Sequence, residues 1–473
     1  MMGYAPWIET VKLASATVGT VSVPDPAIRP VARPAPRPRP TGWPTALQMI
    51  VHAALLTLML ATTHYLVGDP VVSAARWIMY ALLCATLLFR PRGAVSIRKP
   101  RLLDAAALSL IVLAAASALY SGDPSLTVQR SFSLALLYVA VFWTMWAYAD
   151  FAGDLRVANT LLRVAAIVFL AGVANVLLTD TGTIASRYRG VLVNPNAVGM
   201  LAVIFLPLAI AKWVRERSVR MTALTALIVA SVILSGSRNG VLAASVGIVF
   251  MLFRVRAWRS ALLIGTLGTA IYLSMSDSPV NVGRAAESLG RLVSGQSLAL
   301  AGGRVEAWEV ALPIIRQKLA LGHGFGTEET IFKGMIFRIH RGQYVHNSYL
   351  GLTYQLGLAG SLLLFTPLLW LLFRRGFARR RPSIQTAAYE AILFGGLVAS
   401  FFESWIYSAG NAFAFPFWIC VMLLTRIVLG APETPDLWKS RRLVTTPHRF
   451  QGFVTQPKAG IRRFEPPVAQ AGS

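Results

Sequence analysis

The chain has 473 residues, of which 55% are hydrophobic and only 14% are charged, and its mean hydropathy is +0.58. This composition excludes an ordinary water-soluble domain of this length and indicates an integral membrane protein. The formal net charge of +25 would fit a nucleic-acid-binding protein. However, the basic residues lie between apolar runs rather than on one amphipathic face, so we expect no nucleic-acid partner.

Residues 1–45 are predicted to form a disordered cytoplasmic tail. The segment from Arg29 to Pro40 is rich in proline and arginine, which is typical of polyproline character. The apolar stretch after it is too long for the h-region of a signal peptide. A transmembrane catalytic domain is expected over residues 46–430, followed by a basic cytoplasmic tail over residues 431–473.

The apolar segments of this domain predict the fold class. A helix that crosses a bilayer needs about 20 apolar residues. The predicted spans are 47–67, 71–89, 102–120, 131–149, 157–178, 195–213, 220–235, 239–253, 258–276, 348–373, 385–406 and 412–429. Cys84 and Cys420 lie inside such segments and predict no disulfide or zinc framework. We therefore expect an all-α polytopic membrane protein with about twelve transmembrane helices.

Lysine and arginine are distributed unevenly between the connections. Every second connection from 90–101 onward is basic, and together these connections hold 19 Lys and Arg. The alternate short connections hold only Arg130, Arg187, Arg189 and Arg238, with Arg76 just inside the second segment. Because cytoplasmic loops carry the excess of basic residues, both termini should be cytoplasmic and the alternate connections should face outward.

The connection over residues 277–346 is much longer than the others. It lies on the predicted outer side and carries eight Lys or Arg, which long segments tolerate. Trp308 and a helical run from Arg304 to Leu319, interrupted by Pro313, indicate an ordered segment rather than a disordered one. Long loops in compact proteins are usually functional or disordered, so we expect a helical cap on the outer membrane face.

Polar motifs gather on the predicted outer side. They are Ser186–Gly190 with Asn194–Asn196, the hairpin Ser235–Gly240, Gly302–Arg304, and His346–Asn347. Arginine is a natural receptor for phosphate or diphosphate because its charge is permanent and its donors form a planar fork. The alternative is that these arginines reach lipid headgroups or pair with loop acids such as Glu306 and Glu309. Arg238 favours a binding role most, because it is a lone charge in a tight hairpin.

Several further residues are candidates for binding or catalysis. Asn196 and Asn347 each open a predicted helix, where backbone N–H groups can face an anion. His346 can accept a proton from a hydroxyl group, although a structural histidine is the alternative. Glu403, near the outer end of the eleventh segment, can pair with an arginine or act as an acid.

Two features of the long loop point away from a metal or nucleotide site. The spacing of His323, His340 and His346 matches no helical pair of metal ligands, so we expect no metal and no cofactor. Gly322–Gly326 superficially looks like a nucleotide-binding glycine loop. No predicted strand precedes it, and a turn is the better interpretation.

The order of these motifs carries a family resemblance over about residues 100–430. His346-Asn347, followed after nine residues by Gly357-Leu358-Ala359-Gly360, resembles the O-antigen ligase signature. Ser235–Leu242 resembles the Ser-Gly-Ser-Arg hairpin of the same proteins. Weaker blocks are Arg189-Gly190 with Asn194–Asn196, and Gly303-Arg304 with Trp308 and Gly322–Gly326. The sequence thus resembles the superfamily of O-antigen ligases and polymerases, which includes exopolysaccharide polymerases.

The resemblance implies a GT-C-like glycosyltransferase in the bacterial inner membrane. Its metal-independent, inverting reaction would occur at the periplasmic face. The donor would be an oligosaccharide or polysaccharide on undecaprenyl diphosphate, and the acceptor would be a hydroxyl of a saccharide or of lipid A-core. His346, Arg238 and Arg304 would be catalytic. The substrate-binding residues would be Arg189, Asn196, Asn347 and Ser237.

Two alternatives remain at this stage. The motifs do not separate a ligase, which transfers to lipid A-core, from a polymerase, which extends another lipid-linked repeat. A transporter or flippase of lipid-linked saccharides is the alternative from a different functional class. Such proteins usually show internal repeats and ionisable residues near the membrane midplane, whereas here the polar residues gather on one side and the halves show no repeat.

Overall fold

The computed structural model describes residues 44–60, 69–88, 102–184, 187–274, 304–331, 345–376 and 381–429. The chain divides into two units, Met1–Thr41 and Gly42–Ser473, and the described residues all belong to the second. The predicted tails, 1–45 and 431–473, lie outside the described residues apart from the first positions of helix α1. His340 and most of the loop before Arg304 lie outside them as well.

The described chain is mostly helical. Its α-helices are α1 (Pro44–Met59), α3 (Asp69–Ala85), α4 (Leu102–Ala116), α5 (Pro124–Val139), α6 (Trp146–Ala152), α7 (Asp154–Leu178), α8 (Pro195–Glu216), α9 (Val219–Leu234), α10 (Arg238–Arg254), α11 (Trp258–Ser274), α13 (Arg304–Gln317), α14 (Ser348–Gly376), α15 (Ile384–Ala399) and α16 (Ala414–Val428). The π-helix η2 (Ala140–Met145) joins α5 to α6, and the short 3₁₀ turns are η1 (Ser117–Leu119), η3 (Asp180–Gly182) and η5 (Glu328–Thr330).

Each predicted span overlaps a helix in the described residues. Among the described residues, four stretches are long and apolar enough to cross a membrane: Pro124–Ala152, Asp154–Leu178, Pro195–Glu216 and Ser348–Arg374. Shorter apolar helices include those at Val219–Leu234, Ile384–Ala399 and Ala414–Val428. The helical fold class is confirmed, whereas the number of twelve spans remains a prediction.

Helix caps explain where several of these elements begin. The side chain of Asn194 accepts a hydrogen bond from the Ala197 N–H (2.9 Å), and Pro195 occupies the first turn of α8. The Ser237 hydroxyl accepts from the Gly240 N–H at the start of α10 (3.3 Å). Such caps satisfy backbone donors that have no partner inside the helix. Both caps therefore fix polar motifs at helix starts.

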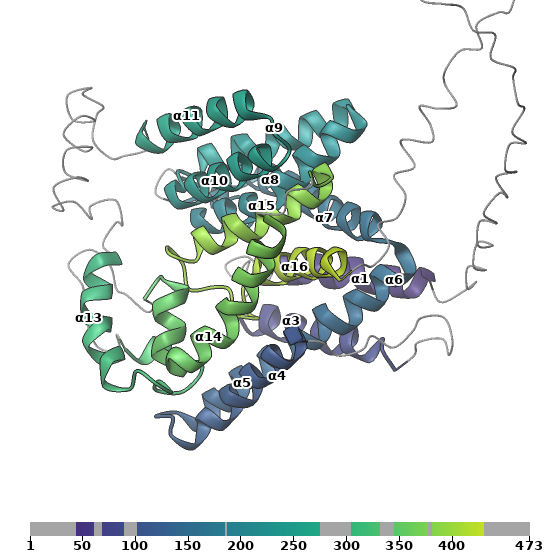
Figure 1. The fold of residues 1–473 in the computed structure, drawn as a ribbon. Coiled ribbons are helices and arrows are strands. Elements are labelled where there is room, and N and C mark those ends of the chain that lie inside the picture. Colours follow the sequence, from purple (N-terminus) through teal and green to yellow (C-terminus); the bar gives the residue numbers. More distant parts are fainter. Residues whose placement is uncertain are drawn as a thin grey trace, which may run out of the picture. The chain divides into compact units, whose positions relative to one another are not determined.

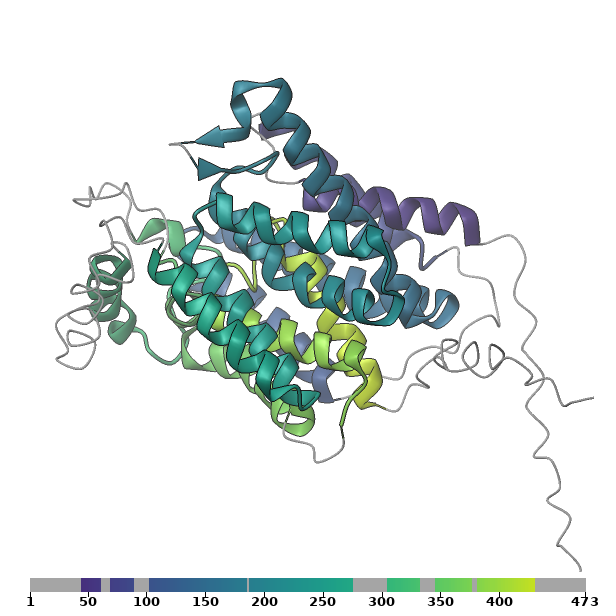
Figure 2. The same cartoon turned by 90° about the horizontal axis from the view of Figure 1, so that it is seen from above.

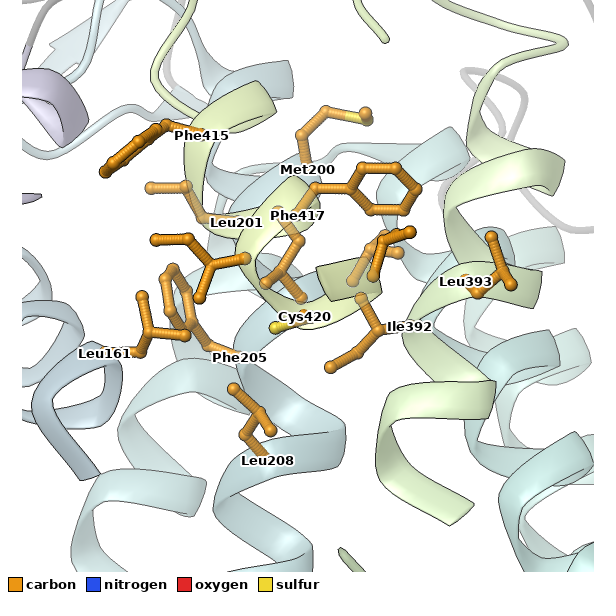
Figure 3. Close-up of a cluster of buried hydrophobic side chains, with 14 of the residues drawn as sticks. Leu161, Met200, Leu201, Phe205, Leu208, Ile392, Leu393, Phe415, Phe417 and Cys420 are labelled. Carbon is orange, nitrogen blue, oxygen red and sulfur yellow. The ribbon is translucent and has the colours of Figure 1, made fainter. Parts of the chain in front are cut away.

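Helix α8 lies at the centre of a layer formed with α9, α10 and α15 (Figure 1). Side chains of α8, α15 and α16 interdigitate there, among them Leu201, Phe205, Ile392, Phe417 and Cys420, all buried (Figure 3). Helices α8 and α10 approach so closely that a Cβ atom on Gly240 would lie only 2.4 Å from the Cα of Gly199. Small residues let helices approach in this way, so the Ser235–Gly240 hairpin lies against the start of α8.

A two-residue ribbon between α7 and α8 was not predicted. Strands β1 (Thr183–Ile184) and β2 (Arg187–Tyr188) pair antiparallel, with Thr183 opposite Tyr188 and Ile184 opposite Arg187. Figure 2 shows them as arrows beside the end of α7. The pairing is too short to produce a recognisable alternating pattern. It orients the Arg187–Gly190 motif toward its partners.

Helix α14 contains a kink at Gly357, a residue of the ligase-like signature. Its φ of +64° is unfavourable for any residue with a side chain. A Cβ atom there would lie 2.2 Å from the backbone of Ala320. The Leu358 N–H donates instead to the carbonyl of Leu319 (2.8 Å). The signature glycine is thus required by a close backbone approach.

The loop segment that packs against this kink is ordered. Gly322–Gly326 forms a turn, as predicted, and its His323 N–H donates to the carbonyl of Tyr354 (2.8 Å). The helix expected in this loop is present as α13, but it continues through Pro313 rather than being interrupted there. The apolar side of α13, with Ala311 buried, packs against Tyr354 of α14, and this contact offsets the lost backbone hydrogen bond.

Candidate functional site

The carboxylate of Glu403, in the connection between α15 and α16, joins three predicted site residues. Its Oε1 accepts from Nη2 of Arg304 (2.7 Å) and from Nδ2 of Asn196 (3.3 Å). Its Oε2 lies 3.2 Å from Nδ1 of His346. These residues come from α13, α8 and the start of α14. We refer to Glu403, Arg304, Asn196 and His346 as the Glu403 cluster.

The charge of Glu403 orients the ring of His346. Burial opposes ionisation of Glu403, but the hydrogen bond and charge of His346 and the charge of Arg304 outweigh it and hold the pKa of Glu403 below its ordinary value. An ionised carboxylate only accepts hydrogen bonds, so Nδ1 of His346 is the donor to Glu403 and Nε2 is the ring nitrogen that remains for a substrate. The His346 side chain is 37% exposed, which leaves it within reach of a substrate.

The backbone of His346 is strained. Its φ of +51° lies in the left-handed region, which residues other than glycine adopt at a cost. The flanking peptides are held in place: the Val345 N–H donates to Oε1 of Glu328 (3.0 Å), and the Asn347 N–H donates to Oγ of Ser404 (3.1 Å). These bonds stabilise the conformation that directs the imidazole at Glu403.

Glu328, in η5, is a second buried carboxylate and was not singled out from the sequence. Besides the Val345 N–H, it accepts from Ser404 Oγ (2.6 Å), Tyr407 OH (2.8 Å) and Gln355 Nε2 (3.2 Å). Burial raises the pKa of Glu328, although the hydrogen bonds from Ser404 and Tyr407 act in the opposite direction. Glu328 therefore ties the His346 segment to the 404–407 connection.

The Ser-Gly-Ser-Arg hairpin is held by Arg187, which was also missed as a site residue. Nε of Arg187 donates to the carbonyl of Ser235 (2.8 Å), and its Nη2 donates to the carbonyl of Gly236 (3.1 Å) and to Oδ1 of Asn196 (3.1 Å). Asn196 thus connects Arg187 to Glu403. The Arg-Tyr-Arg sequence alone could not show which arginine points toward the hairpin.

The second half of the hairpin brings two predicted arginines near one another. Arg238 is half-buried at the first position of α10 and is followed by Asn239. With the Asn239 amide oriented to present its oxygen, Nη1 of Arg304 donates to it (2.6 Å). Arg304 therefore joins the hairpin to the Glu403 cluster.

The remaining predicted residues have structural contacts. Arg189 donates to the carbonyls of Thr181 (2.8 Å) and Val193 (3.5 Å). The side chain of Asn347 caps α14 by accepting from the N–H of Tyr349 (2.9 Å) and of Leu350 (3.1 Å), and Ser237 is the buried cap of α10. At the start of α8 the cap is Asn194, not Asn196, so the amide of Asn196 is available to bridge Arg187 and Glu403.

His323 lies apart from the Glu403 cluster. Its ring stacks on Tyr354 with 4.6 Å between centroids, and its Nε2 lies 3.1 Å from the carbonyl oxygen of Ile314. Within the described ranges, no group of three or more His, Cys, Asp or Glu is arranged to hold a metal ion.

A cavity of about 640 Å³ opens beside His346 and Glu403. Its wall includes the Glu328–Ser404–Tyr407 contacts, the start of α8, and residues from α3 and α5. Charged and aromatic side chains predominate in the part formed by α3, α5 and the 403–413 connection. A polar ligand in this cavity would therefore meet His346.

The family comparison covers part of this site. The model of the O-antigen ligase family matches residues 223–365, which contain the hairpin, Arg304, His346 and the kink at Gly357. No curated protein sequence matches the chain. The match, together with the apolar helices, supports the membership of this membrane protein in the superfamily of O-antigen ligases and polymerases, which are glycosyl-transferring enzymes.

Proposed function

We propose that the protein transfers or polymerises a glycan carried by undecaprenyl diphosphate onto an acceptor hydroxyl, by an inverting and metal-independent reaction. The observation that carries the proposal is the Glu403 cluster, in which one carboxylate holds both His346 and Arg304. Two of these three residues lie inside the region matched by the O-antigen ligase family. A histidine oriented by a carboxylate is a familiar general base for a hydroxyl group.

His346 is the proposed base. The acceptor hydroxyl gives its proton to Nε2 of His346 while its oxygen forms a bond to the anomeric carbon. The bond between that carbon and the diphosphate oxygen breaks, and its electron pair leaves with the diphosphate. Glu403 stabilises the imidazolium that forms. Attack opposite the leaving group inverts the anomeric carbon.

Negative charge develops on the leaving diphosphate as its bond to the anomeric carbon breaks, and nearby positive charge stabilises it. Arg238, at the N-terminus of α10, and Arg304 are the proposed sources, with Arg189 and Asn196 as further donor contacts. Asn347 and Ser237 would contribute mainly as helix caps that hold the backbone around the donor. The combination of a permanent guanidinium charge and a helix N-terminus suits a diphosphate.

The proposed setting is the bacterial inner membrane, with about twelve spans in a GT-C-like arrangement, cytoplasmic termini and a periplasmic active site. Asn196 at the start of α8 and His346 just before α14 both contact Glu403. Arg304, which also contacts Glu403, bonds to Asn239 at the start of α10, and these contacts support a shared face for the three helix starts. The loop over residues 277–346 would cover this face through α13. Transport of lipid-linked saccharides is the less favoured alternative, since the family match is to ligases.

The test is the carbohydrate of cells that carry variants of the chain. His346→Ala, Arg238→Ala and Arg304→Ala should each remove long-chain polysaccharide while the protein remains in the membrane at normal levels. Normal chain-length ladders from all three would contradict the proposal. In a deletion strain, single lipid-linked repeats would indicate a polymerase, whereas full chains left on the carrier would indicate a ligase.

A further inference from the structure

Two arginines that the proposed reaction does not use lie in the wall of the cavity beside His346. Arg76 belongs to the first half of α3 and Arg130 to α5, and both line the cavity together with His346 and Glu403. Among the described residues, the wall includes neither Arg238 nor Arg304. The arginines of the site therefore form two sets, and the pair His346–Glu403 contacts both regions.

The charge of Arg76 is not balanced by a carboxylate in the described part of the chain. Its Nη1 donates to the carbonyl of Gly410 (2.9 Å) and its Nη2 to the hydroxyl of Ser73 (3.3 Å), both neutral acceptors. The guanidinium also lies over the ring of Trp77, 5.1 Å from its centroid. A partly buried cation held only by neutral groups has a strong preference for an anionic ligand.

Arg130 is paired only weakly. Its Nη2 lies 3.3 Å from Oε1 of Glu329, and each side chain of this pair is 41% exposed. Exposed pairs of this kind contribute little free energy and exchange readily. Arg130 and Arg76 both line the same cavity. A phosphate bound there could accept donors from both guanidinium groups.

The rest of the cavity wall suits a sugar. Trp77 and Phe413 are half-buried and provide aromatic surface, and Ser408 and Asn411 provide polar groups nearby. Aromatic side chains combine a large apolar face with geometric definition, which fits the flat side of a pyranose ring. A saccharide in this cavity would have its hydroxyls next to His346, the proposed base.

We propose that this cavity is the acceptor site and that it takes a phosphorylated glycolipid, with the phosphate on Arg76 and Arg130 and the saccharide against the aromatic wall. The inference rests on the proposed function, because it assigns the acceptor to the cavity and leaves the donor to Arg238 and Arg304. The phosphate can come from a second carrier diphosphate, as polymerisation requires, or from a phosphorylated lipid A-core, as ligation requires.

Binding to the full-length protein in lipid nanodiscs tests this assignment. The probes are geranylgeranyl diphosphate, which carries no sugar, and bisphosphorylated lipid A. We expect at least one probe to bind at a site that depends on Arg76 and Arg130. The dissociation constant for this site should rise about tenfold or more in Arg76→Ala and in Arg130→Ala, and it should remain unchanged in Arg238→Ala. The probe that occupies this site identifies the source of the phosphate.

Matched variants separate charge from folding. Arg76→Lys keeps the charge and should retain most of the binding, whereas Arg76→Gln keeps a donor for the Gly410 carbonyl and should lose it. Arg220→Ala removes an exposed arginine at the start of α9 and should change nothing. Melting temperatures of all variants show whether the fold is retained.

The outcomes for the two proposals are distinct. If every probe site is insensitive to both Arg76→Ala and Arg130→Ala, or if Arg220→Ala weakens binding equally, the acceptor assignment is wrong. If no prenyl diphosphate site responds to Arg238→Ala, the donor half of the proposed function is wrong, whatever happens at Arg76.

Discussion

Ionic groups lie at both ends of the helix bundle, and their surroundings differ. At the starts of α8, α10 and α14, the Glu403 cluster borders a cavity and includes a half-exposed histidine. At the other end of α10, Nε of Arg254 lies 2.7 Å from Oε2 of Glu390, with side chains 8% and 0% exposed. Near the end of α16, Arg426 pairs with Asp150 (2.6 Å) and Asp154 (2.8 Å).

The pairs at the second end act as connections between helices. Arg254 joins α10 to α15, and Arg426 joins α16 to α6 and α7. None of these residues lines the cavity beside His346. The Glu403 cluster instead combines ion pairs with a titratable ring, a strained backbone and space for a ligand. Similar charge chemistry thus stabilises the fold at one end and, in our proposal, supports catalysis at the other.

The largest expected effect is that of His346→Ala. Loss of a general base typically reduces a rate about 10²- to 10⁴-fold, while the fold should be retained because Arg304 still pairs with Glu403. Transfer by purified protein in proteoliposomes measures the rate. His323→Ala, which removes an imidazole stacked on Tyr354 outside the cavity wall, is the matched control. A His346→Ala rate no lower than that of the control would contradict the role of His346.

Arg254→Ala should have the converse effect. It leaves the carboxylate of Glu390 buried without its partner, which typically costs about 3–5 kcal/mol of stability. We expect a marked fall in melting temperature and yield, with the transfer rate per folded molecule retained. Arg254→Met combined with Glu390→Leu should recover much of the stability, because an apolar pair needs no charge compensation. A stable Arg254→Ala protein without activity would reverse the comparison.

The local parts of the fold were accessible from the sequence. The length of an apolar segment and its periodicity can be read from neighbouring residues, so the helices occur at the segments where they were predicted. Pro313 shows a limit of such reasoning, because packing of α13 against α14 overrides its local preference. The β1–β2 ribbon shows another, since two pairs of residues leave almost no pattern. The number of membrane spans depends on how each helix lies in the lipid bilayer, which the helices alone do not specify.

The candidate site was accessible only in part. Motif order singled out His346, Arg304 and Asn196, and the structure brings them to one carboxylate. Glu403 was noted as a partner for some arginine, but no sequence rule selects Arg304, which is 99 residues away. Glu328 was missed because hydrogen bonding with distant Ser404 and Tyr407, rather than any local pattern, distinguishes it from its neighbour Glu329.

Arg187→Ala sharpens the comparison at the catalytic end. It removes charge-assisted hydrogen bonds to the hairpin carbonyls and to Asn196, which are worth about 1.5–3 kcal/mol each where they hold charged groups. We expect a transfer rate reduced about tenfold, a smaller effect than that of His346→Ala. Arg220→Ala, which removes an exposed arginine at the start of α9, is the control in the same assay. An Arg187→Ala rate no lower than that of the control would contradict a role for the Arg187 contacts in supporting the hairpin.

The smallest expected effect is an opposite pH dependence at the two carboxylates near His346. The pKa of Glu403 is lowered against the effect of burial, so its stabilisation is present above its ordinary value of 4.5 and is lost as the pH falls through the lowered value. Burial raises the pKa of Glu328, so its contribution is present below 4.5 and is lost as the pH rises through the raised value. Melting temperatures of wild type, Glu403→Gln and Glu328→Gln between about pH 3.5 and 7 measure both. The melting temperature of wild type minus that of Glu403→Gln should increase with pH, whereas the melting temperature of wild type minus that of Glu328→Gln should decrease. If both differences change with pH in the same direction, the two carboxylates do not differ in this way.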